Sequence, residues 1–152
     1  VKSVEMMDRR GHLCEREASS FEVSYRSVSL DADEWFSAGV FSFPLKLNDE
    51  PSVIKPLLAK RNSSQPIGLP SCGSVFKNPE GDHAARLIEA CGLKGFCIGG
   101  ACVSEKHANF IINDDQASAS DIEALIAHVQ REVSSKYHID LHTEVRIIGE
   151  KL

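Results

Sequence analysis

The sequence lacks most of the short motifs that mark nucleotide-binding, metal-binding and redox proteins. It contains neither a Gly-x-Gly-x-x-Gly fingerprint nor a P-loop. Its six histidines share no ligand spacing that would hold a metal ion. Five cysteines occur without a Cys-x-x-Cys pair, an odd number that fits neither a disulfide framework nor a zinc site. We therefore expect no metal and predict reduced, mostly buried thiols at Cys14, Cys72, Cys91, Cys97 and Cys102.

Two further absences limit the possible partners. The net charge is −5 and no run of Lys and Arg forms a basic stripe, which argues against a general nucleic-acid binder. No apolar stretch approaches the roughly 18 residues that suggest a membrane span, and no signal peptide opens the chain. We therefore expect a cytoplasmic protein without nucleic-acid or membrane partners. Because the first residue is Val1 and not Met, we also expect the chain to be cut from a longer one.

What is present is a composition typical of a soluble globular protein, with 42% hydrophobic and 26% charged residues. A chain of 152 residues is long enough for one ordinary domain, or for a small domain plus part of another. A Ser-, Pro- and Gly-rich stretch at 62–73 is the candidate domain boundary.

Residues 71–79 stand out because they are unusually dense in polar functional groups. Gly73 permits backbone angles closed to other residues, so that Ser74 can be presented on a tight bend. Lys77 and Asn78 supply hydrogen-bond donors for an anionic or carbonyl-rich ligand. The stretch therefore predicts a binding site, and the alternative interpretation is a surface turn followed by a short strand.

Hydrophobic periodicity and turn residues predict the elements around this stretch. In the first part of the chain we expect strands at 1–7, 12–15 and 41–47, a helical turn at 17–21, and a helix at 51–61. In the second part we expect a helix capped by Asp82 and closed by Gly92, a strand at 95–103 interrupted by Gly99-Gly100, a strand at 109–113, a helix opened by a Ser120-x-x-Glu123 capping box, and a strand at 144–149.

One enzyme motif competes for the same stretch. Ser74-Val75-Phe76-Lys77 matches the Ser-x-x-Lys nucleophile motif of penicillin-binding proteins and serine β-lactamases. That chemistry requires a helix that places the lysine one turn after the serine. Pro79 lies too close for such a helix, and no Lys-Thr-Gly partner follows. A cysteine nucleophile at Cys72 has no particular histidine to activate it.

Five successive segments carry a resemblance to a known family. They are Pro70–Pro79, Leu87–Gly95, Ile98–Ala101, Val103–Phe110 and Glu144–Gly149. In this order they resemble the UDP-N-acetylenolpyruvoylglucosamine reductases, and the match covers roughly the last two thirds of the chain. Upstream, Tyr25-Arg26 falls where that family has a Tyr-Arg pair, with Val28 in place of the usual serine.

The resemblance implies a flavoenzyme of peptidoglycan precursor synthesis. In this family NADPH reduces FAD, and the flavin passes a hydride to the enolpyruvyl double bond to give UDP-N-acetylmuramate. Carried over by position, Ser74 would donate a proton to the carbon next to the carboxylate, while Arg26 and Glu144 would stabilise the intermediate. Asn78, Lys77 and His107 would help to hold the UDP-sugar.

The resemblance also implies an α+β fold in three parts. Residues 1–65 would be the C-terminal part of the second FAD-binding lobe, 66–143 the substrate-binding domain, and 144–152 a strand that returns to an absent first lobe. Because the glycine-rich flavin loops have no counterpart, we expect a fragment that is inactive alone. Its unpaired C-terminal strand would permit self-association. An alternative is that 66–143 acts as an isolated UDP-sugar-binding module.

Overall fold

The computed structural model describes residues 1–45 and 54–149. The chain divides into two compact units, residues 1–50 and 51–152. Both helices and antiparallel sheets occur, as the α+β prediction requires. The division falls before the first α-helix, whereas sequence composition puts the boundary at 62–73. No helix in the described part of the chain is long and apolar enough to span a membrane.

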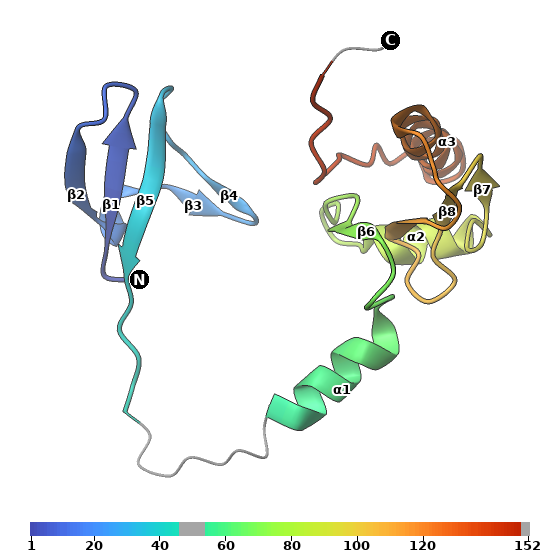
Figure 1. Cartoon of the computed structure of the whole chain (residues 1–152), viewed down its shortest axis with the longest axis horizontal. Helices are drawn as coiled ribbons and strands as arrows, with labels where there is room; N and C mark the ends of the chain where they lie inside the picture. Colours follow the sequence, from blue (N-terminus) through green and yellow to red (C-terminus); the bar gives the residue numbers. More distant parts are fainter. Residues whose placement is uncertain (46–53, 150–152) are drawn as a thin grey trace. The chain divides into compact units, whose positions relative to one another are not determined.

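The first unit is built from short strands (Figure 1). Its described elements are β1 (Ser3–Asp8), β2 (Leu13–Glu17), the 3-10 turn η1 (Ala18–Ser20), β3 (Val23–Ser24), β4 (Ser27–Val28) and β5 (Glu34–Val40). Strands β2, β1 and β5 form an antiparallel sheet in that order, and β3 pairs with β4 in a separate hairpin.

The turn between β1 and β2 follows from its sequence. The carboxylate of Asp8 accepts hydrogen bonds from the backbone N–H groups of Arg10 and His12, and Gly11 takes a positive φ of 81°. A short acidic side chain and a glycine are the residues that such a turn needs. The two predicted strands and the helical turn after them are therefore confirmed.

The prediction of a strand at 41–47 is wrong for the part that the structure describes. The strand in this region is β5, which ends at Val40, and residues 41–45 are not in a strand. The side chains of Phe41, Phe43 and Leu45 are 60%, 81% and 88% exposed, so their alternation does not mark a half-buried face. Residues 46 and 47 lie outside the described residues.

The predicted helix at 51–61 appears as α1 (Ile54–Ser64), and residues 51–53 lie outside the described part. Pro56 occupies its first turn, where the missing N–H of proline costs no hydrogen bond. None of the residues of α1 is buried.

The second unit contains the main hydrophobic core of the described chain. Its further elements are β6 (Ser71–Ser74), α2 (Ala84–Ala90), β7 (Cys97–Ile98), β8 (Ala101–Val103), β9 (Phe110–Asn113) and α3 (Ala119–Tyr137). The strands form one antiparallel sheet of order β6-β9-β8-β7, and α3 contacts β7, β8 and α2 (Figure 1). Apolar residues from α2, α3, the sheet and the segment after β6 fill the core: Val75, Phe76, Leu87, Ile88, Val103, Ile111, Leu125, Ile126, Val129 and Val133.

The paired glycines at 99–100 form the turn of the β7–β8 hairpin. Gly99 has a φ of +54°, and a Cβ atom on Gly100 would come within 1.9 Å of the Asp115 backbone oxygen. The close approach anticipated from the sequence is therefore to the chain's own backbone.

This hairpin also overturns the prediction of reduced thiols. Cys97 lies opposite Cys102 in the register of β7 and β8, and the two form a disulfide. Antiparallel pairing brings side chains five residues apart into contact, which a search for Cys-x-x-Cys spacing does not detect. Cys14 and Cys72 are exposed and not buried.

Both predicted caps at helix N-termini need correction. His83, not Asp82, is the N-cap residue of α2, and the Asp82 carboxylate instead pairs with Arg86 one turn into the helix. Helix α3 opens with a capping box of Ser118 and Asp121, two residues before the predicted one. The predicted closure of α2 by Gly92, which has a φ of +75°, is confirmed.

The predicted strand at 144–149 is also absent from the structure. Residues 144–149 are described and form no strand, and the nearest pairing is an isolated bridge between Phe76 and Thr143. The segment therefore presents no strand edge, and self-association through such an edge is not supported.

Candidate functional site

Ser74 lies at the end of β6, where the strand is distorted. Ser71 pairs with Ile112 and Ser74 with Phe110, so β6 carries one more residue than β9 between these two pairs. Gly73 takes up the extra residue with a φ of +83°, and Ser74 is half-buried. The predicted bend at Gly73 is thus a β-bulge, a distortion that re-aims the side chain next to it.

The residues after Ser74 form an extended, buried segment. Val75 and Phe76 are 1% and 3% exposed. The backbone N–H of Lys77 donates to the carbonyl oxygen of His142 at 2.8 Å, in the antiparallel bridge to Thr143. An extended chain points residues three apart to opposite faces, so Lys77 is not one helical turn from Ser74. This geometry excludes the Ser-x-x-Lys mechanism.

Glu144 is joined to the same segment through its backbone. Its N–H donates to the carbonyl oxygen of Val75, one residue after Ser74, at 2.7 Å. Glu144 is half-buried, and its Oε2 atom is fully buried. Ser74 and Glu144 are 70 positions apart in the sequence, and they are therefore held on neighbouring stretches of chain.

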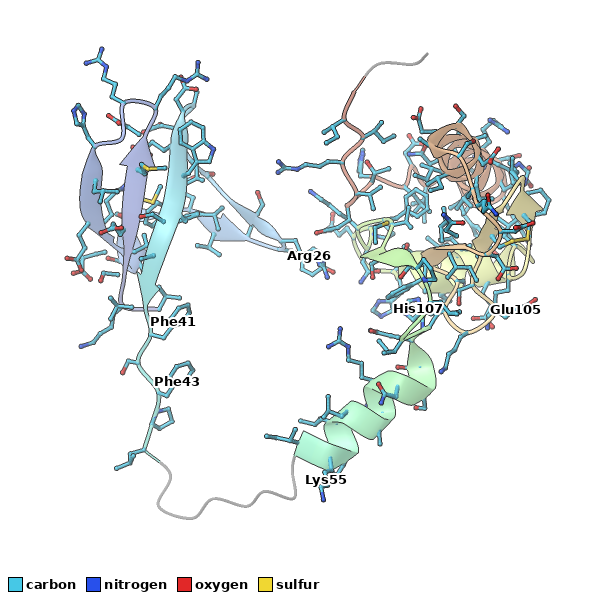
Figure 2. All side chains as sticks on the ribbon, in the orientation of Figure 1. Arg26, Phe41, Phe43, Lys55, Glu105 and His107 are labelled. Atoms are coloured by element: carbon cyan, nitrogen blue, oxygen red, sulfur yellow. A yellow bond between two sulfur atoms is a disulfide. The ribbon has the colours of Figure 1, made fainter. Side chains whose placement is uncertain are left out.

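His107 is fixed in the loop before β9 (Figure 2). The Nδ1 atom of its ring accepts a hydrogen bond from the backbone N–H of Asn109 at 3.3 Å. The ring packs edge-on against Phe110, with 4.8 Å between the ring centroids. Burial lowers the pKa of His107 below its usual value, and the positive charge of Lys94 adds to this effect. With Nδ1 as acceptor, the neutral ring carries its proton on Nε2 and can donate it to a ligand.

Asn78, Lys94 and Lys106 have structural partners. The Oδ1 atom of Asn78 accepts a hydrogen bond from the Ala84 N–H at the start of α2, at 3.0 Å. The ammonium group of Lys94 pairs with Glu89 at 3.3 Å, and that of Lys106 donates to the Asn62 carbonyl oxygen at 2.5 Å. Lys77 is exposed.

A cavity of about 400 Å³ lies beside the loop that carries His107. The disulfide and the loop before β6 line it, together with Ser104, Glu105, Lys106 and Asp114. The buried Ser104 hydroxyl accepts hydrogen bonds from the N–H groups of Lys106 and His107, which shapes this loop. The cavity offers both apolar walls and charged groups, a combination typical of small-molecule sites.

Arg26 belongs to the first unit. Together with Tyr25 it forms the two-residue turn of the β3–β4 hairpin, and Figure 2 shows it at the tip. Its φ of +53° is the left-handed conformation that a type II turn requires at its second central position.

The comparisons with known proteins show to which family the chain belongs. A family model described as UDP-N-acetylenolpyruvoylglucosamine reductase, C-terminal domain, matches residues 65–148. The chain belongs to this reductase family. The predicted resemblance is therefore confirmed.

Members of the reductase family from several bacteria are similar to nearly the whole chain. A curated reductase from Alkalilimnicola ehrlichii is 54% identical over 151 residues, which cover 99% of this chain and 51% of that protein. One from Coxiella burnetii (strain Dugway 5J108-111) is 53% identical over 150 residues, covering 98% and 48%. The crystal structure of the Thermus caldophilus reductase matches 95% of this chain and 52% of its own, with a TM-score of 0.70 and 29% identity. The chain thus spans about half the length of the reductases that it matches.

The described residues of the first unit do not fit a complete FAD site of such a reductase. Flavin pyrophosphates are normally bound by glycine-rich turns or by the N-terminus of a helix. In residues 1–45 the glycines are Gly11, at an exposed hairpin turn, and Gly39, within β5. The only helical element of this stretch is the three-residue η1. These residues provide no pyrophosphate cradle.

Sequence reasoning missed the buried Asn109 of this reductase family member. It is 5% exposed, and its side chain and backbone contact Phe76, Val75 and His107. The available signal was an amide side chain at the start of a predicted apolar strand, a position where burial demands hydrogen-bond partners.

Proposed function

We propose that this chain supplies the substrate side of a UDP-N-acetylenolpyruvoylglucosamine reductase that acts in the cytoplasm in peptidoglycan precursor synthesis. Residues 66–143 would form its substrate-binding domain and residues 1–65 the C-terminal part of its second FAD-binding lobe. The match of the family model to 65–148 and the names of the relatives support this assignment. The observation that carries the proposal is the hydrogen bond from Glu144 N–H to Val75, the residue next to Ser74.

The chemistry of the reaction explains why these groups are needed together. In the complete enzyme, bound FAD would supply the hydride for the enolpyruvyl double bond and would itself be reduced by NADPH. Negative charge then develops on the carbon next to the carboxylate. This carbon must be protonated. Ser74 is the proposed proton donor, and Glu144 with Arg26 would stabilise the charge that develops at the carboxylate.

Three side chains are proposed to bind the UDP-sugar. Lys77 is exposed and can meet a phosphate, while the neutral His107 can donate from Nε2. Asn78 is the third, and its Oδ1 atom accepts a hydrogen bond from the Ala84 N–H at the start of α2.

A chimaeric enzyme tests the role of Ser74. In it, this chain replaces the matching half of the Alkalilimnicola ehrlichii reductase. We expect Ser74→Ala to leave the oxidation of NADPH by the flavin nearly unchanged. Substrate reduction should slow by about 10²–10⁴-fold, the effect of losing a general acid. Stopped-flow absorbance of the flavin separates the two half-reactions.

Ser71→Ala is the matched control, because Ser71 is an exposed serine on the same strand. It should change neither half-reaction. The assignment of Ser74 is wrong if both half-reactions fall together in Ser74→Ala or if neither falls. Substrate binding without any reduction by the unsubstituted chimaera would favour the alternative of a UDP-sugar-binding module.

A further inference from the structure

We infer that Asn109 is a positioning residue that holds Ser74 and Glu144 in register for the substrate. The inference rests on the proposed function of these two residues. Asn109 immediately precedes β9 and is 5% exposed. A buried amide is retained only where its donors and acceptors have partners, so its contacts indicate what it does.

The side chain of Asn109 clamps the backbone of Phe76 from one side. Its Oδ1 atom accepts a hydrogen bond from Phe76 N–H at 2.9 Å, and its Nδ2 atom donates to the Phe76 carbonyl oxygen at 2.8 Å. One side-chain amide therefore satisfies both backbone groups of Phe76, as a neighbouring strand would. The backbone oxygen of Asn109 also accepts from Val75 N–H at 2.9 Å.

The segment that carries Glu144 holds the same backbone from the other side. The carbonyl oxygen of Val75 accepts from Glu144 N–H at 2.7 Å, and Lys77 N–H donates to His142 at 2.8 Å. Residues 75–77 are thus fixed between Asn109 and the 142–144 segment. Because Ser74 directly precedes this stretch, a shift of the stretch would move Ser74 and Glu144 together.

Asn109 also contacts the proposed substrate ligand His107, but only through its backbone. The Asn109 N–H donates to the ring Nδ1 atom of His107 at 3.3 Å. A change of the side chain leaves this N–H in place. Substitution therefore tests the clamp on Phe76 separately from the orientation of His107.

The test uses the chain itself and two measurements by NMR. The first is hydrogen exchange at the amides of Phe76 and Glu144. The second is the Kd for UDP-N-acetylenolpyruvoylglucosamine, followed through the resonances of Ser74 and Glu144. In Asn109→Ala we expect both amides to exchange at least about tenfold faster and the Kd to rise about tenfold, as for the loss of one or two hydrogen bonds. The ring resonances of His107 should change little.

Asn113→Ala is the matched control. Asn113 lies at the other end of β9, and its Oδ1 atom accepts from Ala117 N–H at 2.8 Å, so one side-chain hydrogen bond to the backbone is lost there too. Neither measurement should move. If Asn109→Ala does not fold, Asn109→Ser replaces it, since serine keeps a small polar group at this position but cannot make both hydrogen bonds to the Phe76 backbone. We expect the same changes.

Each outcome decides the inference. Unchanged exchange in the folded Asn109 variants means that there is no clamp. Faster exchange with an unchanged Kd means that Asn109 is structural only and does not position the site. If the unsubstituted chain binds no substrate, the proposed function fails and the role of Asn109 fails with it. That failure appears before any substitution is made, so it is distinct from the other two.

Discussion

At the scale of single residues, the functional side chains depend on environments that the sequence does not display. The motif around Ser74 and the turn at Gly73 were predictable because glycine next to a polar side chain has a local conformational meaning. The role of Asn109 was not, since it depends on Phe76, which is 33 residues away in the sequence. Local patterns give candidate groups, and only long-range pairing selects which of them meet.

The pH dependence of His107 follows from its burial. Burial lowers its pKa below 6.5, so the folded chain favours the neutral ring more than the unfolded chain does. The stability associated with this site is complete above pH 6.5 and is lost as the pH falls from 6.5 through the folded-state pKa. We expect an NMR titration of the chain to give a pKa below 6.5 for His107.

Replacement of His107 tests whether its protonation contributes to the pH dependence of stability. His107→Gln removes the titrating group, so the free energy of unfolding of the variant should fall less than that of the unsubstituted chain between about pH 7 and pH 5. All other titrating groups are common to both proteins. Equal pH dependence of the two unfolding free energies would contradict the assigned cause.

At the scale of elements, periodic hydrophobicity predicted the helices better than it predicted their ends or the strands. The apolar stripe of α3 was predictable from the spacing of Leu125, Ile126, Val129 and Val133, all of which are buried. The same reasoning failed at 41–45, because alternation reports burial only where another layer covers the strand. The Cys97–Cys102 pair required the hairpin register, which Gly99-Gly100 sets.

The start of α3 shows why caps are hard to place from sequence. Both Ser118-x-x-Asp121 and Ser120-x-x-Glu123 have the spacing of a capping box. The structure selects the first, in which the Ser118 hydroxyl accepts from Asp121 N–H at 3.1 Å and the Asp121 carboxylate accepts from Ser118 N–H at 2.9 Å. These hydrogen bonds also lower the pKa of Asp121.

Substitution of the two serines distinguishes the caps. We expect Ser118→Ala to lower the free energy of unfolding by about 1 kcal/mol, because an N–H at the start of α3 loses its acceptor. Ser120→Ala is the control, since Ser120 lies inside the first turn, where alanine is the better helix former. Urea denaturation measures both. A larger loss for Ser120→Ala than for Ser118→Ala would place the cap where the sequence suggested.

At the scale of the whole molecule, the two units differ in how much core they contain. In the described residues, the cluster of buried apolar side chains runs from Val75 to Leu141, entirely within the second unit. Met6 is the one buried apolar side chain described in the first unit. The larger apolar side chains there, such as Phe36 and Phe41, are 45% and 60% exposed and line a hollow of about 480 Å³.

This asymmetry predicts different behaviour of the separated units. Ordering the backbone costs about 1–2 kcal/mol per residue, which a three-stranded sheet with one buried apolar side chain does not offset. We expect residues 51–152 alone to keep the helical circular dichroism of α2 and α3 and to unfold cooperatively on heating. Residues 1–50 alone should give no cooperative transition.

Since α1 has no buried residues, a matched piece that starts at residue 65 should unfold at nearly the same temperature as 51–152. Cooperative melting of 1–50, or loss of helical signal from 51–152, would show that the stability of the chain is distributed differently from its buried apolar surface.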